Sequence, residues 1–247
     1  MAADSKPGGG GASDAPKLMS PEAYIGHPVG ADTRLADWTK IHGYFGHVAE
    51  HSDRVNVREL TKTTQGRPYI VAEVSSPDAI RDRDAHLADR RKVADPRLIV
   101  DEEDERRLIH EGKVVVYFGC AIHGNEVGAT QMSMELLYEL ASGTTSEIQE
   151  ILDRVILVMI PSNDPDGLDN VIEWYKRSLG TAWEGSGMPG IYNEYAGNQN
   201  VWDTVHLNLS ESRADAKLLY REWYPNILGD IHQWGSHSAR LLVPPHS

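Results

Sequence analysis

The chain has 247 residues, of which 40% are hydrophobic and 25% are charged, enough for one large α/β domain. No stretch approaches the roughly 20 consecutive apolar residues of a membrane helix, which argues against a membrane protein. The 37 acidic and 24 basic residues give a net charge of −13. Because this charge would repel a phosphate backbone, nucleic acid is not an expected partner.

The N-terminal 16 residues contain a run of four glycines, and we interpret residues 1–16 as a flexible tail. We expect residues 17–247 to form the domain. The tail lacks the apolar run of a secretory signal, which fits a protein that stays inside the cell or one whose signal has been removed. Cys120 is the single cysteine, so no internal disulfide can form.

The first half of the chain predicts a helix and a β-hairpin. Between Thr33 and Ser52, apolar residues recur at three- and four-residue steps, the spacing of one buried helix face. Two β-rich runs follow, at 54–60 and 68–74, and a connection with glycine joins them. Residues 79–107 are dense in both signs of charge and are interpreted as solvated surface without chemistry.

The second half of the chain predicts buried strands alternating with helices. Nearly continuous apolar runs, typical of strands buried on both faces, are followed or separated by helical stripes. The strands are expected at 114–122, 155–160, 227–231 and 239–243, and the helices at 128–142 and 209–223. We therefore expect a three-layer α/β fold with a mainly parallel mixed sheet, the hairpin as its antiparallel flank, and helices on both faces.

Polar side chains follow two of the buried strands at the edge where a parallel sheet collects its ligands. His123 and Glu126 come directly after the first strand, and His232 closes the strand at 227–231. Imidazole nitrogen and carboxylate oxygen are ligands that Zn²⁺ accepts, and three protein ligands plus a water form a catalytic zinc site. The polar residues Asp230 and Gln233 flank His232 and could orient its ring.

These segments resemble the zinc metallocarboxypeptidases of the carboxypeptidase A type. The resemblance covers about residues 37–245 and rests on the His123–Glu126 and Asp230–Gln233 segments, with support from four more. These are 64–67 (TQGR), 161–167 (PSNDPDG), 174–177 (WYKR) and 223–225 (WYP).

The resemblance implies a zinc-dependent hydrolase that cleaves peptide bonds near the substrate's C-terminus with a metal-activated water. It implies Zn²⁺ held by His123, Glu126 and His232, peptide or protein substrates, and a secreted or periplasmic location. It also implies an arginine that steadies the oxyanion, for which Arg177 is the candidate and Lys176 the competitor. The sequence does not indicate an oligomeric state.

Three features depart from the family pattern. Asp164 stands where the family turn has asparagine, and the asparagine–arginine pair that clamps the terminal carboxylate is replaced by Asn200 or Trp202, depending on register. No residue matches the family's downstream catalytic glutamate, since only 15 residues follow His232. We therefore expect a catalytic domain incomplete at its C-terminal end.

Three functions remain open on these grounds. The chain is a zinc carboxypeptidase, a non-catalytic relative that binds zinc or peptides, or a related deacylase acting on N-acylated amino acids.

Overall fold

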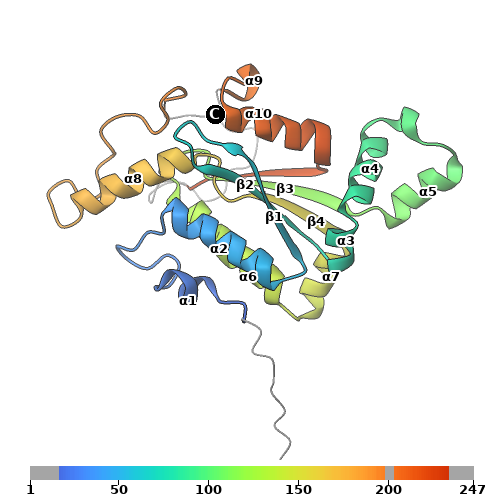
Figure 1. Ribbon diagram of the computed structural model, residues 1–247, viewed down its shortest axis with the longest axis horizontal. Helices are drawn as coiled ribbons and strands as arrows, with labels where there is room; N and C mark the ends of the chain where they lie inside the picture. The colour runs from blue at the N-terminus through green and yellow to red at the C-terminus, as the bar shows by residue number, and fades with distance from the viewer. Residues whose placement is uncertain (1–16, 198–202, 234–247) are drawn as a thin grey trace, which may run out of the picture.

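The computed structural model describes residues 17–197 and 203–233, and it has a five-stranded mixed sheet at its centre (Figure 1). The proposed tail at 1–16, the strand expected at 239–243, and the candidates Asn200 and Trp202 lie outside the described residues. Among the helices that are described, none is long and apolar enough to cross a membrane.

The sheet has the strand order β1-β2-β4-β3-β5. The five strands are β1 (Val55–Lys62), β2 (Pro68–Val74), β3 (Val114–Cys120), β4 (Val155–Ile160) and β5 (Ile227–Ile231). Strand β3 pairs in parallel with β4 and β5, whereas β2 is antiparallel to both β1 and β4. The expected hairpin flank and the expected strands up to residue 231 are therefore confirmed as strands. The expected burial of the strand at 227–231 on both faces is wrong, because Ile227 and Leu228 of β5 are 54% and 55% exposed.

Successive residues of the strands point to opposite layers of helices. In β4, Leu157 and Met159 pack into the larger hydrophobic cluster, and Ile156, Val158 and Ile160 pack into the smaller one. The larger cluster contains residues of five helices, and the smaller one contains residues of the elements covering the other face. The first set is α1 (Pro21–Ile25), α2 (Trp38–His51), α6 (Val127–Ser142), α7 (Ser146–Arg154) and α8 (Pro165–Ser178); the second is α4 (Arg83–Ala94), α10 (Ser210–Lys217) and the π-helical turn η3 (Leu218–Trp223). Two helical layers around one sheet confirm the predicted α/β fold.

The helix predicted from residue 33 begins only at Trp38. The side chain of Asp37 accepts a hydrogen bond from the Lys40 backbone N–H at 3.1 Å, which caps the first turn of α2. The helix predicted at 209–223 is present as α10 and η3 together. A further short helix, α9, covers Asp203–His206.

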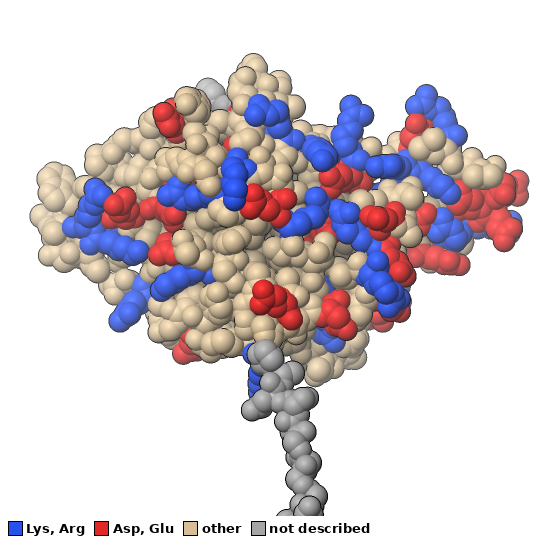
Figure 2. Space-filling model, viewed as in Figure 1, with Lys and Arg blue, Asp and Glu red and all other residues tan. Residues whose placement is uncertain are grey.

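The charged stretch at 79–107 is helical. It contains α3 (Pro77–Arg81), α4, the short 3₁₀ helix η1 (Pro96–Leu98) and α5 (Glu102–Glu111), and α4 and α5 project from one end of the molecule (Figure 1). Asp101 caps α5, and four acidic residues occupy the first turn, where the helix dipole favours negative charge. Figure 2 shows both signs of charge intermixed over this end of the surface, as expected for a solvated face.

Candidate metal centre

The ends of β3 and β5 are held side by side beyond the carboxyl edge of the sheet. Ala121, directly after β3, donates its backbone N–H to the Ile231 carbonyl at 3.1 Å. Ala121 is fully buried and has a left-handed backbone with φ of 51°. This turn lets the chain leave the sheet so that His123 faces the residue that follows β5, His232.

Glu126 lies at the end of the same loop, where it is the N-cap residue of α6. Its backbone N–H donates to the His123 carbonyl at 2.9 Å, which closes a tight turn between the two residues. Gly124 within this turn passes against α8, because a Cβ atom built on it would lie 2.3 Å from the Gly167 carbonyl carbon. Only glycine allows the loop to come this close to Gly167, so the loop that carries His123 packs directly against the start of α8.

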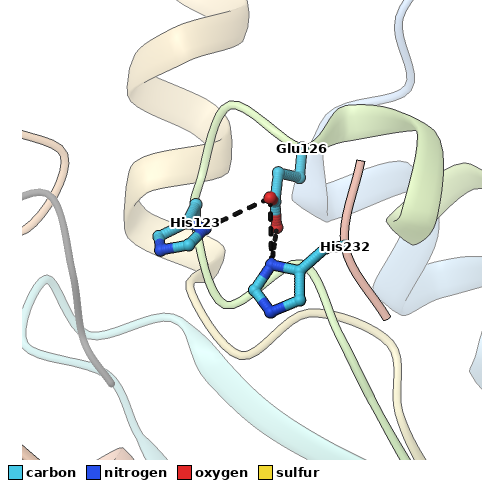
Figure 3. Close-up of side chains that lie close together, drawn as sticks. All are labelled: His123, Glu126 and His232. Atoms are coloured by element: carbon cyan, nitrogen blue, oxygen red, sulfur yellow. Dashed lines mark hydrogen bonds and ion pairs between the residues drawn. The ribbon is translucent and has the colours of Figure 1, made fainter. Parts of the chain in front are cut away.

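The three side chains converge on the carboxylate of Glu126 (Figure 3). His123 Nδ1 lies 3.1 Å from Glu126 Oε1, and His232 Nδ1 lies 3.0 Å from both carboxylate oxygens. The imidazole centroids are 5.1 Å apart, and one candidate ligand atom from each residue lies within 4.8 Å of the others. Glu126 is buried and both histidines are partly exposed, so the cluster is open on the histidine side.

Two partners fix the orientation of the loop after β5. His232 Nε2 lies 2.9 Å from Asp230 Oδ2, and the side-chain oxygen of Gln233 accepts the Gly128 N–H at 2.8 Å. Burial lowers the pKa of His232, but the hydrogen bond to Glu126 and the charge of Asp230 outweigh burial, so the pKa is raised overall. With Nε2 engaged by a carboxylate, Nδ1 is the nitrogen directed at Glu126.

The donor set fits a divalent zinc ion. Two imidazole nitrogens and one carboxylate are ligands of catalytic zinc, and a carboxylate on the second nitrogen of a ligating histidine is a common supporting contact. His123 Nε2 is buried and has no hydrogen-bond partner among the described residues. The cluster therefore has the composition and proximity of a three-ligand zinc site that leaves a position for water.

The structure does not bring Arg177 to this cluster. Arg177 lies near the end of α8, with 68% of its side chain exposed, and it pairs with Glu173 one turn earlier. Gly167, which contacts the His123 loop, lies ten residues before it, a rise of about 15 Å along an α-helix. Lys176 is also exposed and lies 3.6 Å from Asp37.

A second set of polar contacts joins the hairpin turn to the start of α8. Asp166 is buried and accepts hydrogen bonds from Thr63 Oγ1, Gln65 N and Arg67 Nη1 at 2.7–2.9 Å. Arg67 also donates to Asp169 at 2.6 Å. These contacts join the segments 64–67 and 161–167, which both carry the family resemblance. They hold the hairpin turn against the start of α8, beside the His123 loop.

Sequence reasoning missed Asp215, which lines a cavity of about 250 Å³ together with Ile122, the neighbour of His123. Its carboxylate accepts hydrogen bonds from Tyr69 and Asn163 at 2.9 Å. Burial raises the pKa of Asp215 to about 7, although both hydrogen bonds act in the opposite direction. The helical spacing of 209–223 placed Asp215 on a helix, but nothing in the sequence showed that it faces the sheet.

A family model for zinc carboxypeptidases matches residues 41–187, more than half of the chain. The match includes His123, Glu126 and the segment 161–167. The chain therefore belongs to the zinc carboxypeptidase family.

Solved structures with similar folds include a carboxypeptidase. Carboxypeptidase A from Helicoverpa armigera is 15% identical, with a TM-score of 0.51 over 87% of this chain and 52% of that chain. Bovine thrombin-activatable fibrinolysis inhibitor in complex with tick carboxypeptidase inhibitor is 14% identical, with a TM-score of 0.49 over 82% of this chain and 62% of that chain. The likeness to the Helicoverpa enzyme supports the same fold.

The chain spans only part of these relatives, covering 32% of one thrombin activatable fibrinolysis inhibitor structure and 52% of the Helicoverpa enzyme. No curated protein matches the chain.

Proposed function

We propose that this chain is a zinc-dependent metallocarboxypeptidase-type hydrolase that acts on peptide bonds near the C-terminus of its substrate. The observation that carries the proposal is the convergence of His123, Glu126 and His232 within 4.8 Å at the carboxyl edge of the sheet. The family match and the fold support the same chemistry.

The roles of the residues follow from their positions. His123, Glu126 and His232 would hold zinc, which supplies a polarised carbonyl and a water of lowered pKa when bound. Asp230 holds the second nitrogen of His232 and so orients the ring toward Glu126. A role for Arg177 in steadying the oxyanion requires its side chain to leave Glu173, and the carboxylate-clamp roles of Asn200 and Trp202 remain predictions.

Metal content tests the site directly. We expect the purified protein to contain one zinc per chain, measured by mass spectrometry of the metal, and His123→Ala or His232→Ala to lose it. His110→Ala, at an exposed position on α5, is the matched control and should keep its zinc. Full zinc retention in both site variants would rule out the proposed centre.

Substrate preference separates the enzyme from the two alternatives. A carboxypeptidase hydrolyses a peptide with a free C-terminus and spares the same peptide with an amidated C-terminus, whereas a deacylase cleaves an N-acylated amino acid instead. If the zinc-loaded chain turns over none of these compounds, these 247 residues lack hydrolase activity, and the result favours the non-catalytic alternative only if a chain extended past Ser247 is also inactive. Loss of turnover in His232→Ala, with His110→Ala unaffected, would assign any observed activity to the proposed centre.

A further inference from the structure

A second cavity lies at the opposite end of the sheet from the candidate metal centre. Its volume is about 360 Å³, and it is enclosed by α4, η1, α5 and the first residues of β3 and β4. Strand β3 enters the sheet beside this cavity at Val114 and leaves it at Cys120, shortly before His123. The volume falls within the range of roughly 300–1,000 Å³ typical of small-molecule sites.

Part of the cavity wall is apolar, and this part comes mainly from α4 and α5. Val93 of α4 faces Leu108 and Ile109 of α5, and Val114 and Ile156 close the side toward the sheet. Leu108 is buried, whereas Val93, Ile109 and Val114 are 43%, 67% and 40% exposed. The cavity therefore has an apolar side with partly exposed side chains that an apolar ligand would cover.

Arg90 lines the same cavity and carries a buried charge without a carboxylate partner among the described residues. Its side chain is on the buried face of α4, 8% exposed, and it donates only to the backbone carbonyls of Trp223, at 3.1 Å, and Tyr224. The neighbouring Arg83 and Arg107 each pair with a carboxylate. Burial accordingly lowers the pKa of Arg90, while carboxylates raise the pKa of the other two.

Lys113 adds a second positive charge to the cavity wall. Its ammonium donates to the carbonyls of Leu152 and Asp153 at 2.9 and 2.5 Å and to Ser76 Oγ at 3.3 Å, and no carboxylate in the described part of the chain lies within ion-pair distance of it. Burial is the main cause that lowers the pKa of Lys113.

The acidic residues of the cavity do not neutralise these two cations. Both carboxylate oxygens of Asp89 are taken by Arg107, at 2.8 and 2.6 Å, and Glu105 is exposed on α5. The third cation of the wall, Lys92, is itself paired with Asp104 at 2.8 Å. Buried charges are normally paired, so the cavity offers positive charge for which a ligand could supply the counter-ion.

We propose that this cavity binds a small organic carboxylate with an apolar body, its carboxylate directed at Arg90, its negative charge also attracted by Lys113, and its body between α4 and α5. A guanidinium favours a carboxylate geometrically and electrostatically, and the apolar walls favour a chain or ring over a bare ion. The site is distinct from the proposed metal centre and does not depend on hydrolase activity.

Octanoate is the probe that combines both features. Titration calorimetry with the full 247-residue chain should show saturable binding of octanoate, with acetate, octanol and octylammonium each at least about ten-fold weaker. Arg90→Met and Lys113→Met should each weaken octanoate by about ten-fold, and Val93→Trp should block it by filling the cavity.

Three controls make the result decisive. Arg97→Met removes an 88% exposed arginine of η1 that does not line the cavity, and His123→Ala alters only the candidate metal centre; both variants should bind octanoate normally. Circular dichroism confirms that each variant is folded, and Val93→Trp and Lys113→Met carry the test if Arg90→Met does not fold. Octanoate binding no tighter than acetate binding, or equal binding by the unaltered chain and the folded cavity variants, would overturn the proposal.

Discussion

Ala121 determines how His123 leaves the sheet. Its positive φ lies in the left-handed region, which costs roughly 1–2 kcal/mol for a residue with a side chain. Its backbone N–H donates to the Ile231 carbonyl and so joins the ends of the two strands that precede the histidines. Among residues with a Cβ atom, alanine has the smallest side chain. We infer that the strain is retained because the turn directs His123 toward Glu126.

Substitutions at Ala121 should separate backbone strain from the chemistry of the ligands. We expect Ala121→Val to lower the free energy of unfolding by about 2 kcal/mol, because a β-branched residue is disfavoured at positive φ and the site is fully buried. Ala121→Gly should change it by less than about 1 kcal/mol, because relief of strain offsets the extra entropy of the unfolded chain. Urea denaturation of the metal-free proteins measures both values, and equal losses for the two variants would contradict this account.

The three candidate ligands could be selected from the sequence, but the backbone around them could not. His123, Glu126 and His232 were visible because each follows a strongly apolar run, and runs of that kind predict buried strands. The φ of Ala121 and the close contact of Gly124 with Gly167 depend on neighbours that are distant in the chain. The exposed position of Arg177 could not be predicted either, because α8, the helix that carries it, was not predicted from the sequence.

At the scale of elements, the sheet was easier to predict than the helices. Strands β3 and β4 are short and almost continuously apolar, a pattern that can be recognised whatever the length of the connecting chain, whereas β5 is less regular because it contains Gly229 and Asp230. Helices α4 and α5 were interpreted as plain surface because their buried faces are narrow: only Arg90 and Leu108, respectively, are buried. With so few apolar positions, the spacing of apolar residues does not indicate a helix.

The contact between the hairpin turn and α8 should be a main source of stability behind the His123 loop. Removing Arg67 would leave Asp166, whose side chain is 1% exposed, without its cationic partner. We expect Arg67→Met to lower the free energy of unfolding by about 2 kcal/mol, less than a fully buried pair because Arg67 is itself 26% exposed.

Arg81→Met provides the matched comparison, since Arg81 is 66% exposed and pairs with Asp78 on the same short helix. Its loss should leave the free energy of unfolding nearly unchanged, because solvent screens the pair. Both values come from urea denaturation at neutral pH. Similar costs for the two substitutions would show that the Arg67 contacts do not tie the two elements together.

At the scale of the whole molecule, the candidate centre joins parts of the chain that are distant in sequence. His123 and Glu126 follow β3, which lies between β4 and β5, whereas His232 follows β5, which pairs only with β3 among the described strands. A metal bound by all three residues would therefore attach β5 to the rest of the fold. Binding energy at such a site adds to the stability of the whole folded state, because the unfolded chain does not hold the ligands together.

Zinc should therefore raise the thermal stability of the entire chain. At a free zinc concentration one hundred times its dissociation constant, the expected stabilisation is about 2.7 kcal/mol, which corresponds to a Tm increase of about 5–10 °C for a protein of this size. Scanning calorimetry with zinc and then with excess chelator should show the increase and its reversal. His232→Ala should abolish the increase, while His110→Ala should keep it. An equal zinc-induced shift in His232→Ala would mean that the ion binds elsewhere and that β5 is not secured by the proposed centre.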